Sequence, residues 1–182
     1  QGHESWSYNL NIYEVNTRQY TPSGTFKAFA THLDRLKDMG VGILWFMPIH
    51  PIGLKNRLGT LGSPYSVKDY LQVNPEFGTV DEFKILVDSI HAKGMYVIMD
   101  WVANHTAWDN VLTQTNPEWY LTDSEGNFTP PSGTNWSDVI QLDYSQQGLR
   151  DYMIDAMTYW IEQVDVDGFR CDAVSFMPAD FW

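Results

Sequence analysis

Four short apolar segments alternate with amphipathic stretches along this chain, and this alternation constrains the fold more than any other feature. The apolar segments predict strands, and apolar residues three or four positions apart predict helices. The expected strands cover residues 9–15, 41–47, 95–99 and 167–174, and the expected helices cover 25–39, 79–93 and 146–163. A strand, helix, strand order of this kind is typical of right-handed βαβ units around a parallel sheet. The sequence therefore predicts an α/β fold.

Residues at the ends of the expected helices support their boundaries. Thr79 and Glu82 have the spacing of a capping box, and Ser145 is the expected cap of the third helix. Gly40 and Gly94 follow the first two helices, at the position where glycine commonly ends a helix. Each of these helices is therefore expected to stop just before the next strand.

Length and composition limit what such a fold can be. The 182 residues suffice for one domain with a sizeable core, whereas a closed eight-stranded α/β barrel takes about 250 residues. No apolar run approaches the roughly 18 residues that a membrane helix needs, so we expect no membrane insertion. The net charge of −12 makes nucleic acid an unexpected partner because it repels phosphate backbones. Cys171 is the single cysteine, which excludes an internal disulfide.

Two long connections, residues 49–78 and 101–144, follow the second and third expected strands and are rich in Pro, Gly, Asn and aromatic residues. Long irregular loops in a compact domain are usually functional. In parallel α/β folds, ligands bind at the carboxyl ends of the strands, where such loops begin. We therefore expect the chemistry of this chain at those strand ends.

Polar residues follow the last two strands at these ends. The third strand is followed by Asp100 and His105, and the fourth contains Arg170 and Asp172, whose side chains share one face because strand residues alternate. A guanidinium beside a carboxylate stabilises the ionised form that a nucleophile needs. The spacing alone leaves other interpretations open: an ion pair that only holds the sheet, Asp100 as a loop cap, and His105 as a hydrogen-bonded loop residue. Cys171 is expected to be a small packing residue.

Several strings in chain order resemble the α-amylase superfamily, glycoside hydrolase family 13, in the first half of its catalytic barrel. They are Ile12–Asn16 with Arg18–Tyr20, Gly42–Pro48, Ser63–Tyr70 with Phe77–Thr79, Asp100–His105 and Gly168–Asp172. The resemblance implies a partial TIM (β/α)8 barrel. On this reading, residues 1–182 are the N-terminal half of the catalytic domain, with its first four βα units and residues 101–144 as a short B-like loop, and the chain ends before strand five.

The resemblance also implies roles for particular residues. Asp172 matches the catalytic nucleophile, and Arg170 matches the arginine that supports it. Tyr65 resembles the tyrosine that stacks under the sugar at the cleavage subsite, and His105 resembles a histidine that hydrogen-bonds that sugar. Asp100 matches an aspartate that braces the site.

A metal ion is left open by the same resemblance. Asn104 resembles a calcium ligand of many α-amylases, but Gln141 stands where the family often has a second, carboxylate ligand. Hard cations prefer clustered carboxylate oxygens, so calcium is not expected to be required. No other cofactor is implied.

The implied activity is retaining hydrolysis of α-glucosidic bonds in starch-like glucans or maltooligosaccharides. This reaction needs two carboxyl groups about 5–5.5 Å apart. In the family, the acid/base glutamate lies on strand five and a further aspartate follows strand seven, so the chain alone is expected to be inactive. We also expect it to self-associate, because half a barrel has open strand edges.

Other functions remain open. An α-glucan transglycosylase or isomerase would share every string quoted above, and a non-catalytic carbohydrate-binding relative would share the fold. A doubly wound nucleotide-binding domain is disfavoured because residues 16–20 contain no glycine-rich loop. The acidic charge and many aromatic residues fit an exported polysaccharide enzyme slightly better than a cytoplasmic one.

Overall fold

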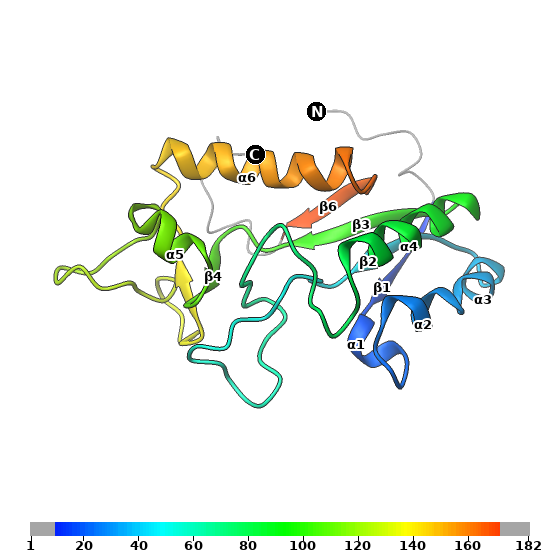
Figure 1. Ribbon diagram of the computed structural model, residues 1–182, viewed down its shortest axis with the longest axis horizontal. Helices are drawn as coiled ribbons and strands as arrows, with labels where there is room; N and C mark the ends of the chain where they lie inside the picture. The colour runs from blue at the N-terminus through cyan, green and yellow to red at the C-terminus, as the bar shows by residue number, and fades with distance from the viewer. Residues whose placement is uncertain (1–9, 172–182) are drawn as a thin grey trace.

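A computed structural model describes residues 10–171 and shows a four-stranded parallel sheet in the order β1-β2-β3-β6 (Figure 1). The strands are β1 (Asn11–Val15), β2 (Val41–Phe46), β3 (Tyr96–Trp101) and β6 (Gly168–Cys171). Helices connect them, which confirms the α/β fold. Within residues 10–171, no pairing joins β1 to β6, so the sheet is open rather than closed into a barrel.

Short and long helices lie between the strands. They are α1 (Thr17–Tyr20), α2 (Phe26–Ala30), α3 (Leu33–Asp38), α4 (Val80–Ala92), α5 (Leu112–Thr115), the 3₁₀ turn Pro117–Trp119 and α6 (Gln147–Glu162). Among the described residues, no helix is both long enough and apolar enough to cross a bilayer.

One face of the sheet packs against the helices and forms the core. The Phe46 ring of β2 lies edge-on to Phe29 of α2 and to Phe83 of α4, with ring centroids 5.4 and 5.6 Å apart. Phe83 in turn contacts Trp160 of α6 at 6.1 Å. All four side chains are buried. Because edge-to-face rings pack densely, this cluster fixes the helices against the sheet.

The opposite face of the sheet is more open. It carries Ile12, Trp45, Ile98 and Arg170, which are all partly or largely exposed, and Ile12 is 60% exposed. Asp100 lies on the same face but is buried. This is the face that a barrel would enclose, and it carries the candidate site.

The caps at the two ends of α4 were predicted correctly. The Thr79 side chain accepts a hydrogen bond from the Glu82 backbone N–H at 3.1 Å, and Gly94 follows the helix with a φ of +77°. A left-handed backbone of this kind favours glycine because a Cβ atom would clash. The capping box therefore sets the start of α4 and the glycine permits its sharp end.

The single helix predicted for residues 25–39 was wrong, because two helices occupy this stretch. Thr25 caps α2. Thr31 and His32 keep right-handed helical backbone angles, but their N–H groups donate three positions back, to the Ala28 and Phe29 carbonyls, before α3 begins. The Thr31 hydroxyl donates to the Ala28 carbonyl at 2.7 Å. Such a bond competes with the helical backbone bonds. The short helix α1, which Asn16 caps, was also not predicted.

Two further details differ from the sequence interpretation. Ser145 does not cap α6, because the helix follows Gln146 and the Ser145 hydroxyl donates to Asp143 at 2.7 Å. β3 extends to Trp101 instead of ending at residue 99, because β6 pairs with it as far as Trp101 opposite Cys171. Asp100 is therefore a strand residue and not a cap of the following loop.

The long connection after β3 contains structure of its own. β4 (His105–Ala107) and β5 (Val139–Gln141) pair as antiparallel strands. The pairing brings the two ends of residues 101–144 together, and Figure 1 shows the intervening segment extending to one side of the sheet. The hairpin therefore holds His105 in a fixed position near the end of β3.

Candidate active site

Three side chains from separate parts of the chain converge on Asp100. The Tyr65 hydroxyl donates to Asp100 Oδ2 at 3.0 Å, and Trp45 Nε1–H donates to the same oxygen at 3.2 Å. Arg170 Nη1 donates to both Asp100 oxygens at 3.2 Å. The structure therefore brings together three of the predicted site residues, Tyr65, Asp100 and Arg170.

The register of the strands explains why these side chains lie within hydrogen-bonding distance of Asp100. Asp100 of β3 lies directly opposite Arg170 of β6. Trp45 of β2 lies opposite Ile98, two positions before Asp100, and so faces the same side of the sheet. Tyr65 reaches the group from the connection between β2 and α4. The site therefore depends on three adjacent strands and one loop.

Burial and charge oppose each other at Asp100. Its side chain is fully buried, and burial raises the pKa of the carboxyl above its usual value. The Arg170 charge and the hydrogen bonds from Tyr65, Arg170 and Trp45 partly offset this rise in pKa. These donors favour the ionised form. The ionised form of the buried Asp100 carboxyl therefore depends on the Arg170 charge and on these hydrogen bonds.

His105 belongs to a second group of contacting residues, on β4 in the connection after β3. It is buried on β4, and its Nδ1 atom lies 3.3 Å from Nδ2 of Asn104. The Trp136 ring contacts the His105 ring at 5.6 Å and is 39% exposed. The Tyr70 hydroxyl donates to the His105 carbonyl at 3.1 Å, which fixes the backbone here. An exposed aromatic ring therefore lies against a candidate sugar-binding histidine.

Asp172, the predicted nucleophile, lies outside the described residues. Arg170 is described, and its guanidinium forms an ion pair with Asp100. The support that Arg170 is expected to give Asp172 therefore stays a prediction. Cys171, between them, is half-buried, and burial raises the pKa of its thiol to about 11. A neutral thiol fits the packing role expected for Cys171.

The calcium hypothesis also stays a prediction. Among residues 10–171, no group of three or more His, Cys, Asp or Glu side chains is arranged to hold a metal ion. The Gln141 side-chain oxygen accepts a hydrogen bond from the Ser132 backbone N–H at 3.0 Å. Calorimetry with and without calcium would test whether Asn104 contributes to a site.

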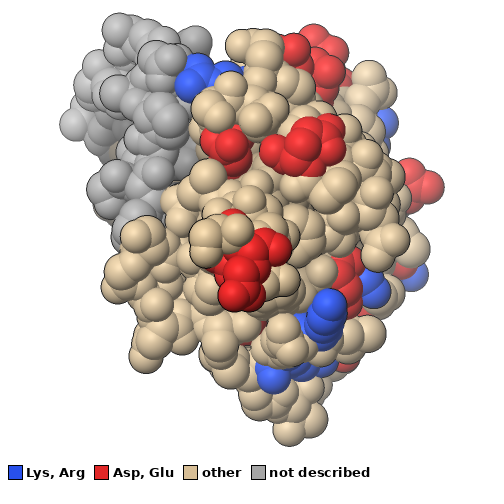
Figure 2. Space-filling model, turned by 90° about the vertical axis from the view of Figure 1, so that its left-hand side faces the viewer, with Lys and Arg blue, Asp and Glu red and all other residues tan. Residues whose placement is uncertain are grey.

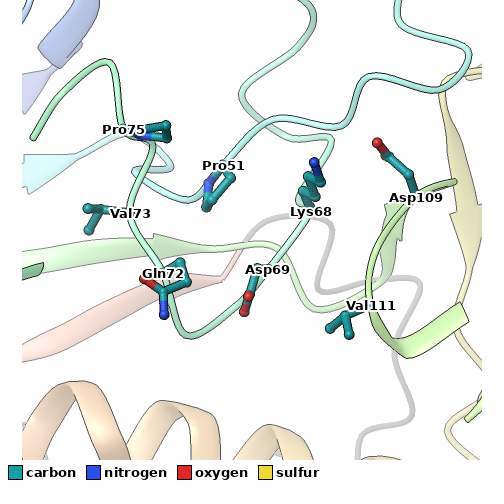
Figure 3. A pocket seen from close by; sticks show the side chains of 8 residues that line it. All are labelled: Pro51, Lys68, Asp69, Gln72, Val73, Pro75, Asp109 and Val111. Carbon is teal, nitrogen blue, oxygen red and sulfur yellow. The ribbon is translucent and has the colours of Figure 1, made fainter. Parts of the chain in front are cut away.

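A hollow in the described part of the chain lies elsewhere. It has a volume of about 410 Å³ and is lined by residues from the two long connections, which Figure 3 labels. Its polar lining residues are Lys68, Asp69, Gln72 and Asp109. Figure 2 shows acidic side chains spread over the face at the left end of Figure 1. None of the candidate site residues lines this hollow, so we do not assign it to catalysis.

Trp45 is the site residue that the sequence interpretation missed. It lies within the string Gly42–Pro48 that carries part of the resemblance, but no role was assigned to it. Its position on an expected parallel strand next to the Asp100 strand was the available signal. The distance from Trp45 to Asp100 depended on the register, which the sequence alone did not give.

The family model described as the catalytic domain of alpha amylase matches residues 7–181. The crystal structure of an alpha-amylase from Lactobacillus plantarum is similar to 94% of this chain, with a TM-score of 0.90 and 48% sequence identity. The chain covers 40% of that protein.

Two curated relatives extend the comparison to other reactions. A 1,4-alpha-glucan branching enzyme of Corynebacterium glutamicum is 30% identical over 92% of this chain and 22% of its own length. A trehalose synthase/amylase of Mycobacterium tuberculosis is 29% identical over 95% of the chain and 34% of its own length. The chain thus spans less than half the length of each of these proteins.

Proposed function

Since this chain belongs to the α-amylase catalytic-domain family, we propose that it carries the nucleophile half of an enzyme that acts with retention on α-glucosidic bonds. The observation that carries the proposal is the buried Asp100 carboxylate, bound by Tyr65 and Arg170 at the carboxyl ends of β3 and β6. Ligands of parallel α/β folds bind at these strand ends. Asp172 follows Arg170 by two positions in the sequence, the spacing at which strand residues share a face.

The proposed chemistry uses Asp172 as the nucleophile. Asp172 attacks the anomeric carbon while the glycosidic oxygen leaves with a proton from a general acid, which gives a covalent glycosyl-enzyme. Water or a second sugar hydroxyl then attacks the same carbon and releases Asp172. Arg170 keeps the nucleophile ionised and oriented. Tyr65 supports the sugar ring, and His105 donates a hydrogen bond to it.

We propose starch-like glucans or maltooligosaccharides as the substrate. The similar alpha-amylase supports hydrolysis as the first choice because its identity to this chain is 48%. The branching enzyme and the trehalose synthase/amylase support a second candidate, transfer of the glycosyl group to a sugar hydroxyl. Both reactions share the glycosyl-enzyme and differ only in the acceptor.

We further propose that these 182 residues need additional chain for turnover, because no glutamate among them matches the family's acid/base residue. The isolated chain is also proposed to self-associate. β1 lies at the edge of the sheet, where Ile12 is 60% exposed and Leu10 is 36% exposed. Exposed edges of this kind pair with other chains. Sedimentation of the isolated chain tests this, and a monodisperse monomer would contradict it.

Trapping of the intermediate tests the function. A 5-fluoro-α-glucosyl fluoride has a leaving group that needs no acid, so in the complete enzyme it should label Asp172, as peptide mass spectrometry would show. Asp172→Ala should abolish both labelling and glucan cleavage, whereas the surface variant Asp88→Asn should change neither. Release of a β-configured product, or labelling at another residue, would contradict the proposal.

Product analysis then separates the two candidates. A hydrolase should release α-configured reducing sugars from maltooligosaccharides, and NMR of the fresh products reports this configuration. A transferase should instead give longer, branched or rearranged products with few new reducing ends.

A further inference from the structure

Trp45 contacts both members of the ion pair at the site. Its indole N–H donates to Asp100 Oδ2 at 3.2 Å, and its ring lies beneath the Arg170 guanidinium, with 5.1 Å between the guanidinium carbon and the ring centroid. Trp45 is only partly buried, so its ring forms part of the open face of the sheet. One side chain therefore touches an anion through its edge and a cation through its face.

We propose that Trp45 is a positioning residue, which sets the orientation of Arg170 toward the nucleophile by holding the guanidinium between its ring and Asp100. This inference rests on the proposed function, because it assigns Trp45 a part in the same reaction. Trp45 is not expected to touch the reacting atoms; it acts through Arg170.

The geometry gives a reason why Arg170 needs this second contact. The Arg170 side chain is 40% exposed, and a long, partly exposed arginine loses rotamer freedom when it is held in one place. Nη1 donates to both Asp100 oxygens, and the Trp45 ring covers the face of the guanidinium, 5.1 Å from its carbon. A ring at this position favours one orientation of the guanidinium plane through cation–π attraction.

The Trp45 N–H has a separate effect on Asp100. It shares Oδ2 with the Tyr65 hydroxyl, so this oxygen accepts from two uncharged donors while Arg170 supplies the charge. Two other described titratable groups lie nearby: Cys171, whose raised pKa keeps its thiol neutral, and Glu14 of β1, which lies opposite Trp45. Loss of the Trp45 N–H removes one donor that favours ionised Asp100. Protonated Asp100 would then release Arg170 at a higher pH than in the wild type.

Two substitutions separate the contacts. Trp45→Phe keeps a ring beneath Arg170 and removes the N–H donor, whereas Trp45→Leu removes both and keeps an apolar side chain. Trp160→Phe is the matched control, because the Trp160 indole N–H also donates one hydrogen bond, to the Tyr70 carbonyl at 2.9 Å, but lies in the core. All variants are made in the complete enzyme and assayed on a maltooligosaccharide.

The expected result is a loss in kcat with little change in KM. Loss of a hydrogen bond to a charged group predicts about a 10-fold fall in kcat for Trp45→Phe and a larger fall for Trp45→Leu. The acidic limb of the pH–kcat profile should move to higher pH in Trp45→Phe. Trp160→Phe should lower the melting temperature and leave the profile where it is.

Several outcomes would overturn the inference. One is a folded Trp45→Phe enzyme with wild-type kcat and an unmoved acidic limb, and another is a shift of the limb in Trp160→Phe as well. If Trp45→Leu does not fold, Trp45→Phe still decides the question, because it preserves most of the ring volume. A wild-type enzyme that does not act on α-glucans would instead refute the proposed function.

Discussion

Replacement of Asp100 by asparagine should reduce turnover while leaving the fold nearly as stable as before. The side chain is fully buried, so its charge is expensive to hold inside the protein. Asparagine has nearly the same shape and no charge. Its amide oxygen can replace Oδ2 and keep the bonds from Tyr65 and Trp45. Its amide nitrogen, in contrast, cannot accept from Arg170.

The expected changes in kcat and in stability follow from the hydrogen bonding that Arg170 loses and from the buried charge that is removed. Arg170 loses its bond to Oδ1 and the negative charge of its acceptor at Oδ2, and a hydrogen bond to a charged group is typically worth about 1.5–3 kcal/mol. If this contact orients the nucleophile, kcat should fall by about 10- to 150-fold. The free energy of unfolding should change by only about 1 kcal/mol, because removal of the buried charge offsets the lost bond and because Arg170 is partly hydrated.

The pH dependence of stability adds a second signature. The pKa of Asp100 is raised in the folded protein, so the native state holds this proton more tightly than the unfolded state does. Stability should therefore fall as pH rises from the ordinary aspartate range through the raised pKa. Asp100→Asn should remove this component.

The assay combines steady-state kinetics on a maltooligosaccharide with calorimetry of the complete enzyme. Asp88→Asn, at an exposed position on α4, is the matched control and should alter neither measurement. A variant that retains kcat within about threefold of the wild type would refute the reasoning. So would a steep fall in melting temperature with full activity in the folded protein, because Asp100 would then only hold the sheet.

Three further predictions test other parts of the structure. Burial lowers the pKa of His50 to about 4, so the folded protein holds this ring neutral and should lose stability as pH falls from about 6.5 to 4. His50→Gln should flatten that part of a plot of unfolding free energy against pH. A Cβ atom at Gly53 would lie 2.3 Å from the Ala107 Cβ atom, so Gly53→Ala should lower the free energy of unfolding by about 1–3 kcal/mol in chemical denaturation. Unchanged stability would show that the segments around Gly53 and Ala107 separate freely. Trp136 lies against His105 with its ring partly exposed, where it could stack on a sugar, so Trp136→Ala should raise KM for a maltooligosaccharide by about 10-fold with little change in kcat. An unchanged KM would exclude a sugar contact at Trp136.

Strong local signals made much of the fold predictable. The capping box at Thr79 and the glycine after α4 are interactions within a few residues, and the sequence shows them directly. The break at Thr31 is also local, but it depends on whether one hydroxyl bonds to its own helix, and an apolar stripe does not report this. The hairpin of β4 and β5 joins segments more than thirty residues apart, and its strands are too short to show periodicity.

The sequence predicted which residues form the candidate site better than it predicted the contacts between them. The resemblance singled out Tyr65, Asp100 and Arg170, which the structure brings into contact. The sequence interpretation linked Arg170 to Asp172 two positions away and did not foresee its pairing with Asp100 across the sheet. That pairing depends on the register of β3 and β6, which are joined through a long loop and a helix. For the same reason, Trp45 could not be assigned.

The ion pair between Asp100 and Arg170 also bears on how the chain reaches its final state, because 70 positions separate the two residues. During synthesis, the aspartate leaves the ribosome well before its cation does. Contacts of such long sequence separation form slowly. Until β6 docks, a buried Asp100 would lack its counter-ion, so early intermediates should keep this strand end hydrated. The site would then be completed in the same late step that completes the sheet.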